Sequence, residues 1–325
     1  MRTELPQNFP AKQKSELNKI VKILRENVEV EMVVLYGSYA KGDFVIEDKN
    51  MERGTVFRSD FDLMVVVKSP QVENQVKGWE LSEKEIMANP RMKTKPSFVV
   101  TNIADLNQKL KRGRYFFADI YKEGILLFDS GKYKLNEPVE FQYLSDAEKL
   151  EQAEEYFEVW MDKADDALET FGFAFERGKT KKTMWSKAAF ELHQATEKLF
   201  NCTELTFIAY RPPSHNLWEL KERCQKFIPA LKNFFFDEKQ KCICGKKKTP
   251  SIFKSQKGLE DICTNCNPPA ALFVKLAEAY VDAQFGKDYQ ITKEELEQIH
   301  AKVLELKVVV EKACVRLIGR LRRAA

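Results

Sequence analysis

With 325 residues, the chain is long enough for about two domains, each with its own hydrophobic core. Its 44% hydrophobic and 31% charged residues are typical of a globular protein, and a net charge of +4 does not by itself require a nucleic-acid partner. The first residues hold no apolar core and no apolar run approaches a membrane span, so we expect neither a signal peptide nor a membrane protein. The seven cysteines, an odd number, then indicate a reducing, cytoplasmic location rather than a disulfide framework.

The N-terminal half alternates between helix-like and strand-like stretches. Apolar residues recur at helical spacing over 12–26 and predict an amphipathic helix, and a Val-rich run over 29–35 predicts the first strand. Residues 43–58 alternate around Gly54 and indicate a hairpin excursion, which is either a flap near a site or only a long connection. Beyond it we expect a strand from residue 60, helices over 71–88 (interrupted at Gly78), 102–111 and 114–122, and strands over 97–101 and 124–128, in a small α/β domain spanning residues 1–137.

The first strand ends at Gly37 and Ser38, where a helix is expected to begin. Gly37 can take backbone angles closed to other residues, so the chain can bend sharply there. Ser38 would then lie at a helix start, where unpaired N–H groups and the helix dipole favour a phosphate. Lys41 follows within the same turn of chain and adds a positive charge. This stretch therefore predicts a phosphate cradle.

Two aspartates open the next strand. Period-two alternation puts Asp60 and Asp62 on one face, with Phe61 and Leu63 on the other. Two hard oxygen ligands aimed at one point suit Mg²⁺, which usually holds nucleotide phosphates as well. The alternative, two surface aspartates, fits less well at the mouth of an apolar strand. A phosphate cradle followed by a metal pair predicts phosphoryl or nucleotidyl transfer.

The run GSYAKG at 37–42 followed by SDFDL at 59–63 resembles the G-S…D-x-D signature of the nucleotidyltransferase superfamily, which includes polymerase β-like and minimal nucleotidyltransferases. The resemblance implies a small mixed sheet and Mg²⁺-dependent transfer of a nucleoside monophosphate to a hydroxyl. It also implies NTP, which we expect to be ATP, as the donor. The residues it assigns are Asp60 and Asp62 as catalytic Mg²⁺ ligands, and Gly37, Ser38 and Lys41 as nucleotide-binding groups.

One feature departs from that superfamily. Its members usually bring a third carboxylate to the metal from a later strand, and the strand expected over 97–101 holds no acid. Asp105 and Asp119 are the nearest substitutes, but Asp105 is better explained by a capping arrangement with Asn102 at a helix start. The group that would accept the proton of the incoming hydroxyl is therefore left open.

From Ser145 onward the sequence is almost entirely helical, after strand character stops at 135–138. Ser145 and Glu148 form a capping box, and an apolar stripe follows it. The pattern predicts an antiparallel helical bundle over residues 145–325. Its helices are expected from 145 to about 172, over 182–202, from Ser214 to 227, over 269–285 and over 292–322.

Three runs in this half, FELHQATEK at 190–198, PSHNL at 213–217 and YVDA at 280–283, resemble a HEPN domain, a nucleotide-binding bundle. With the N-terminal half, the whole chain resembles a fused nucleotidyltransferase–HEPN protein of bacterial type. The resemblance makes a homodimer plausible, because helical bundles of this kind often pair.

Ribonuclease members of the HEPN family carry an Arg, then four to six residues, then a His. Here only three residues separate Arg211 from His215, which disfavours a nuclease. The simpler interpretation of His215 is that it belongs to a helix start. For His193, a packing role on a helix face is commoner than a catalytic one. A third interpretation is that His193, Lys198, Arg211 and His215 line a polar pocket between the domains and contact the acceptor or the nucleotide.

A Cys-rich insertion at about 237–268 holds two close pairs of thiols. Pairs about twenty residues apart can meet as a tetrahedral structural Zn²⁺ site, although the first pair is one residue short of the usual spacing. The alternative is four free cysteines. The residues concerned are Cys242, Cys244, Cys263 and Cys266.

The sequence as a whole predicts an α+β protein: an N-terminal nucleotidyltransferase domain followed by an all-α HEPN-like bundle that shapes the acceptor site. The acceptor is a small molecule, a protein or RNA, so nucleic acid is compatible but not required. Three alternatives stay open: a non-catalytic nucleotide- or RNA-binding module, a toxin–antitoxin-like regulatory unit, and an aminoglycoside-type antibiotic nucleotidyltransferase.

Overall fold

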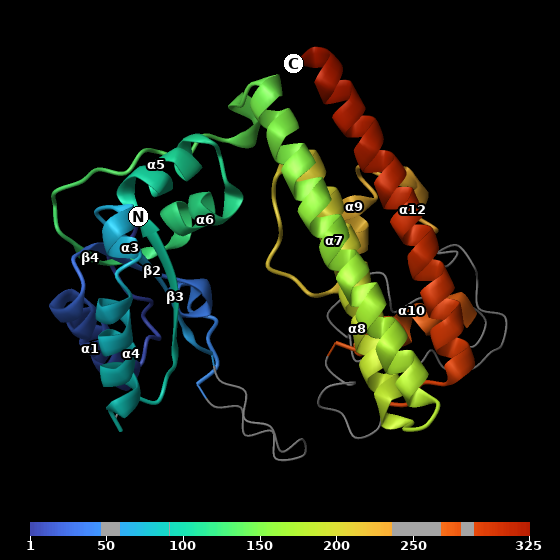
Figure 1. The fold of residues 1–325 in the computed structure, drawn as a ribbon, viewed down its shortest axis with the longest axis horizontal. Coiled ribbons are helices and arrows are strands. Elements are labelled where there is room, and N and C mark those ends of the chain that lie inside the picture. The colour runs from blue at the N-terminus through green and yellow to red at the C-terminus, as the bar shows by residue number, and fades with distance from the viewer. Residues whose placement is uncertain (47–58, 91, 236–267, 281–288) are drawn as a thin grey trace. The chain divides into compact units, whose positions relative to one another are not determined.

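A computed structural model describes residues 1–46, 59–90, 92–235, 268–280 and 289–325 (Figure 1). The chain forms two compact units, Met1–Leu144 and Ser145–Ala325, which are described separately below. Most of the predicted hairpin at 43–58 and nearly all of the Cys-rich insertion lie outside the described residues. Among the helices described, none is long and apolar enough to cross a membrane.

The first unit is built on a mixed four-stranded sheet, as the sequence predicted. Its strands are β1 (Val30–Tyr36), β2 (Phe61–Val67), β3 (Pro96–Asn102) and β4 (Ile125–Asp129), in the order β3-β2-β1-β4. β1 runs antiparallel to both β2 and β4, whereas β3 runs parallel to β2. The register places Tyr36 opposite Asp62, so the end of β1 meets the start of β2.

Helices cover both faces of this sheet because its central strands alternate apolar side chains between them. Leu63 and its face pack against α1 (Ala11–Asn27) and α4 (Val76–Ala88). Met64 and the opposite face pack against α5 (Ile103–Lys111) and α6 (Tyr115–Glu123). Asp62 has the same parity as Met64, so it lies at the mouth of the face that α5 and α6 cover. Two short helices, α2 (Gly37–Lys41) and α3 (Pro70–Glu73), follow β1 and β2.

The helix predicted over 71–88 is broken, but not at the predicted place. The break lies at Asn74 and Gln75, between α3 and α4, whereas Gly78 lies inside α4. A Cβ at Gly78 would come within 2.7 Å of the Asn27 carbonyl oxygen at the end of α1. Glycine is therefore a packing requirement of the α1–α4 contact here, and not a helix breaker.

The second unit is all-helical, as predicted. The long helices α7 (Asp146–Gly178), α8 (Thr183–Ile208) and α12 (Lys293–Ala324) lie side by side in Figure 1. The capping box of Ser145 and Glu148 is present, and Thr292 and Glu295 form a second one at the start of α12. The shorter elements of this unit are α9 (Leu217–Cys224), the 3₁₀ turn η2 (Pro229–Leu231) and α10 (Pro268–Glu278). A further 3₁₀ turn, η1 (Phe141–Tyr143), ends the first unit.

Candidate functional site

The Gly-Ser bend and the Asp pair lie against each other at the end of β1. Gly37 has a φ of +70°, in the left-handed region that favours glycine, and it begins α2. A Cβ built on Gly37 would overlap Oδ2 of Asp62 and would lie only 3.0 Å from its Cγ. The Asp62 carboxylate therefore contacts the Gly37 backbone directly, and Ser38 is the next residue along.

The two aspartates differ in environment. Asp60 is exposed just before β2, whereas Asp62 is half-buried in its second position. Burial raises the pKa of Asp62, and the negative charge of Asp60 raises this pKa further. Within the described residues, the Asp62 carboxylate forms no hydrogen bond or ion pair. A partly desolvated carboxylate next to a second one is a donor set that fits a divalent cation, which would offset both unfavourable effects.

Tyr36 lies across from Asp62 and closes one side of this site. Burial, followed by the charge of Asp62, raises the pKa of Tyr36 to about 12. Its ring also packs edge-on against Phe116 of α6, with the ring centroids 5.6 Å apart. The Tyr36 phenol is therefore uncharged at ordinary pH and lines one side of the site.

Lys41, at the end of α2, is engaged by α6. Its Nζ lies 3.0 Å from Oε2 of Glu123, in an exposed pair of the kind that contributes little to stability. Burial raises the pKa of the nearby Asp119, the charge of Glu123 raises it too, and Lys41 acts in the opposite direction. Binding of a phosphate by Lys41 would require it to exchange Glu123 for the new anion.

The structure supplies no third acid beside Asp62 from the next strand. In the parallel register of β2 and β3, the residue paired with Asp62 is Ser97. Asp105 is occupied elsewhere: it accepts a hydrogen bond from Thr101 and pairs with Lys109, while its N–H donates to Asn102 at the start of α5. No group of three or more His, Cys, Asp or Glu side chains placed to hold a metal occurs among the residues described.

Comparison with protein families agrees with this geometry. Residues 18–133 match the family described as Polymerase beta, Nucleotidyltransferase. These residues form a polymerase β-type nucleotidyltransferase domain. The match spans all four strands and both motifs of the site. It suggests a transferase activity on a nucleotide, and enzymes of this family typically use Mg²⁺. A comparison with curated proteins returned no match to the chain.

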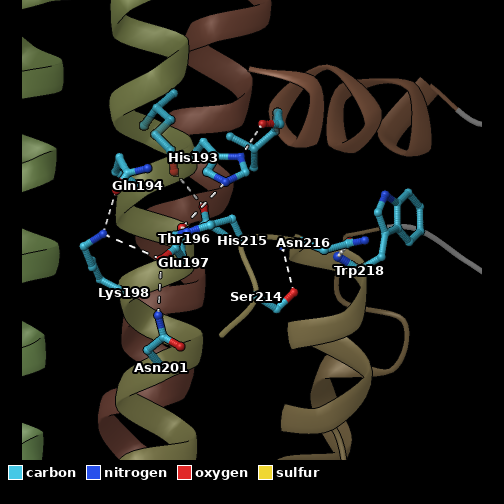
Figure 2. Close-up of polar contacts among 12 residues, drawn as sticks. His193, Gln194, Thr196, Glu197, Lys198, Asn201, Ser214, His215, Asn216 and Trp218 are labelled. Carbon is cyan, nitrogen blue, oxygen red and sulfur yellow. Dashed lines mark hydrogen bonds and ion pairs between the residues drawn. The ribbon is translucent and has the colours of Figure 1, made fainter. Parts of the chain in front are cut away.

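The family match ends at residue 133 and does not reach the helical unit, so the HEPN resemblance stays a prediction. The unit does bring together His193, Lys198, Arg211 and His215, around a residue that the sequence reasoning missed, Glu197 of α8. Figure 2 shows Glu197 with His193, Lys198 and His215 around it. The Glu197 side chain is 1% exposed. His215 donates its Nδ1–H to Oε2 of Glu197 at 2.9 Å, and Arg211 Nη2 lies 3.6 Å from Oε1.

Two further cations or potential cations face the same carboxylate. The Lys198 Nζ and the His193 Nε2 each lie 3.9 Å from a Glu197 oxygen. Burial alone would raise the pKa of Glu197, but the His215 hydrogen bond and the charge of Lys198 outweigh it and hold this pKa below its ordinary value. Glu197 is therefore ionised and acts as the common counter-ion of the cluster.

His193 behaves as a buried neutral side chain. Its Nδ1–H donates to the Leu276 carbonyl at 3.0 Å, and burial lowers its pKa to about 4. These contacts favour the packing interpretation of His193 over a catalytic one. His193 and Glu197 are four residues apart on one helix face, and that spacing is the signal that could have identified Glu197.

Aromatic rings hold the other two cluster residues. The His215 ring stacks on Tyr280 at 4.6 Å with an interplanar angle of 14°, and the Arg211 guanidinium lies 5.3 Å from the centroid of Trp160. Within the described part of the chain, the buried Nε of Arg211 has no hydrogen-bond partner. The cluster is thus a polar centre within the helical unit, packed against aromatic rings. Its predicted location between the domains stays a prediction.

The predicted zinc ligands, Cys242, Cys244, Cys263 and Cys266, lie outside the described residues. The other three cysteines, Cys202, Cys224 and Cys314, are free thiols buried in the helical unit.

Proposed function

We propose that this protein is a Mg²⁺-dependent nucleotidyltransferase that moves a nucleoside monophosphate from NTP, preferentially ATP, to a hydroxyl acceptor. The observation that supports this most directly is the contact between the Gly37 backbone and the Asp62 carboxylate inside a polymerase β-type domain. That contact places a bend rich in backbone N–H groups beside two acids, so a polyphosphate and a divalent cation could be held together.

In this proposal, the backbone at Gly37 and Ser38 binds the polyphosphate, and Lys41 adds a charge after leaving Glu123. Asp60 and Asp62 hold Mg²⁺, which when bound neutralises the polyphosphate and makes pyrophosphate a better leaving group. The acceptor oxygen forms a new bond to the α-phosphorus while the bond to the bridging oxygen breaks. The domain contributes mainly positioning and charge, as is usual in phosphoryl transfer.

The acceptor proton needs a base, and Ser97 cannot serve in place of the missing acid. We assign this role to Asp119, because α6 covers the same sheet face as Asp62 and because burial raises the pKa of Asp119 above its ordinary value, which makes its carboxylate a stronger base. Replacement of Asp119 by Asn should then lower the rate of transfer while leaving ATP affinity unchanged.

Incubation with α-labelled ATP and Mg²⁺ tests the main proposal, with transfer to the protein itself, to RNA and to a small-molecule extract measured separately. Asp60→Asn and Asp62→Asn should each reduce transfer by roughly 100-fold or more. Glu26→Gln is a matched control, since Glu26 lies on α1 in an exposed pair with Lys22. Equal labelling by the wild type and the two Asp variants would refute these roles.

For the helical unit, we propose that Lys198, Arg211 and His215 contact the acceptor or the nucleotide, whereas His193, predicted with them, keeps the packing role that its burial favours. The two cations that face the Glu197 carboxylate, Lys198 and Arg211, support an anionic ligand. If an Arg211→Ala, His215→Ala double variant kept the wild-type nucleotide affinity and acceptor KM, this assignment would be wrong.

A second candidate function is a nucleotide-binding module without catalysis. The pairing of Ser97, rather than an acid, with Asp62 favours it. Binding of ATP with Mg²⁺ but without turnover on any acceptor class would single it out.

A further inference from the structure

A groove runs along the C-terminal half of α12 in the helical unit. It has a volume of about 710 Å³ and is open to solvent along α12. Phe207, at the end of α8, and Phe227, after α9, line one side, and Arg316, Arg320 and Arg323 of α12 line the other. None of these residues belongs to the nucleotidyltransferase site or to the Glu197 cluster.

The three arginines form one charged row. They stand four and three residues apart, so they share one face of α12, and all three are exposed. Within the described residues, none of them forms an ion pair, whereas Arg322 of the same helix pairs with Glu154 of α7 at 2.7 Å. The row is therefore a strip of positive charge that no carboxylate of the described chain neutralises.

The helix dipole does not account for this row. Cations are favoured at a helix C-terminus, but the effect falls off within the last turn. That turn contains Arg322 and Arg323, whereas Arg320 lies just before it and Arg316 lies more than one turn earlier. The helix dipole therefore does not explain Arg316, and Arg320 lies at the edge of its reach.

Two aromatic rings line the groove, and a glycine leaves space beside them. The Phe207 and Phe227 rings are 5.2 Å apart and half-buried, so part of each ring faces solvent. Gly319 lies between the arginines, and a Cβ there would meet only the Arg323 guanidinium, at 3.9 Å. Packing does not require this glycine, which costs about 1 kcal/mol relative to alanine inside a helix. Its effect is to keep the groove open between the charges and the rings.

We propose that this groove binds single-stranded nucleic acid. Guanidinium groups match phosphate oxygens, and aromatic rings beside a basic strip are surfaces on which unpaired bases stack. A single strand fits better than a duplex, because paired bases could not reach the rings. The inference goes beyond the proposed transfer reaction, since it uses none of the residues of that site.

Fluorescence anisotropy of the full chain with a labelled oligouridylate of about 12 nucleotides tests the proposal. The wild type should bind, and a log–log plot of affinity against salt should include a slope of roughly −2 from three phosphate contacts. A triple variant, Arg316→Gln, Arg320→Gln, Arg323→Gln, should bind roughly tenfold more weakly or worse and should lose that part of the salt slope.

Two matched controls separate the groove from general charge and from helix stability. Arg322→Gln removes one positive charge from the same helix outside the groove and should leave affinity within about twofold, whereas Arg320→Gln, which removes one charge inside the groove, should weaken binding more. Gly319→Leu keeps every charge but fills the groove and should weaken binding, whereas Gly172→Leu on α7, where a Cβ meets nothing within 4 Å, should not.

Three results would overturn the proposal: no binding by the wild type, an equal loss in Arg322→Gln, or equal competition by a polyglutamate peptide, which would indicate an acidic protein partner instead. Asp62→Asn should bind the oligonucleotide normally. Failure of this inference is therefore distinguishable from failure of the proposed transfer reaction.

Discussion

The Asp62 carboxylate occupies the space that a side chain at residue 37 would need. Oδ2 of Asp62 lies where the Cβ of any other residue in place of Gly37 would be built, and Gly37 has a positive φ as well. Two independent constraints, one on backbone angle and one on volume, therefore select glycine at this position. The contact links the bend after β1 to the acid at the start of β2 in the manner that the proposed chemistry needs.

Replacement of Gly37 by Ala should separate these two constraints when it is compared with Gly131→Ala. Gly131 has a similar φ of +73°, but a Cβ there meets nothing within 4 Å, so its replacement should cost only the backbone strain, about 1 kcal/mol. Gly37→Ala should cost at least about 1 kcal/mol more, because the Asp62 carboxylate must move. It should also weaken Mg²⁺–ATP binding, which Gly131→Ala should leave unchanged.

Urea unfolding and calorimetric ATP titration of the two variants provide the measurement. Equal destabilisation by both substitutions, together with normal ATP affinity in Gly37→Ala, would show that the close contact has no functional consequence.

Asp62→Asn should stabilise the protein while abolishing transfer. Burial and the charge of Asp60 raise the pKa of Asp62 in the folded state, so its ionised form is the one that folding disfavours. The resulting loss of stability begins as the pH rises above the ordinary value of 3.8 and is complete above the folded-state pKa. At pH 7 without Mg²⁺, the Asn variant should therefore unfold at a higher temperature than the wild type.

Thermal unfolding from pH 4 to 8, with and without Mg²⁺, tests whether the Asn variant is the more stable protein. The advantage of the Asn variant should shrink as the pH falls towards 4, and Mg²⁺ should stabilise the wild type alone. A less stable Asn variant at pH 7, or equal stabilisation of both proteins by Mg²⁺, would contradict the assignment of Asp62 as a cation ligand.

Much of the nucleotidyltransferase domain could be predicted because local patterns carry it. The alternation through Phe61, Asp62 and Leu63 specified which side chains face the α1–α4 core, and the Gly-Ser bend marked where β1 ends. The break at Asn74 could not be predicted in the same way. Gly78 is the stronger breaker by propensity, but tertiary contact with the Asn27 carbonyl overrides propensity there.

The polar centre of the helical unit shows a different limit. His193, Lys198, Arg211 and His215 stood out because of their types and spacing, whereas Glu197 looked like one of many helical glutamates. Its role depends on His215, which lies 18 residues away in sequence and reaches it only through the path of the chain after α8. A buried counter-ion of this kind follows from the total charge of a site, which the sequence does not show before the fold is known.

Acid should destabilise the helical unit through His193. Burial lowers its pKa to about 4, so between the ordinary value of 6.5 and pH 4 the unfolded state binds the proton more readily. Stability should therefore fall as the pH falls through this window, by roughly 3 kcal/mol at pH 4 from this group alone. His193→Asn, which can keep the donor to the Leu276 carbonyl, should remove most of that dependence.

The same substitution at His300 is the matched control. Burial also lowers the pKa of His300, but this side chain is only partly buried and rests on the Phe171 ring, so His300→Asn should change the pH dependence less. Urea unfolding followed by tryptophan fluorescence, at several pH values between 4 and 7, measures both. A pH dependence in His193→Asn as steep as that of the wild type would show that another group is responsible.

The seven cysteines should divide into two classes by reactivity. We propose that Cys242, Cys244, Cys263 and Cys266 bind one structural Zn²⁺ per chain, on the basis of their spacing in the sequence. The other three are buried in the bundle, and burial raises the pKa of the Cys224 thiol well above its ordinary value, so they should react slowly with a thiol reagent. Addition of a chelator should release zinc, expose four fast-reacting thiols and lower the unfolding temperature, while the remaining three react only on unfolding.

Two variants distinguish the classes. Cys242→Ser should lose zinc, whereas Cys314→Ala should keep it and lose only the roughly 1 kcal/mol of packing that a small buried side chain contributes. Metal analysis of each purified protein decides the question. Less than stoichiometric zinc in the wild type, with no effect of the chelator on stability, would mean that the four cysteines are free thiols.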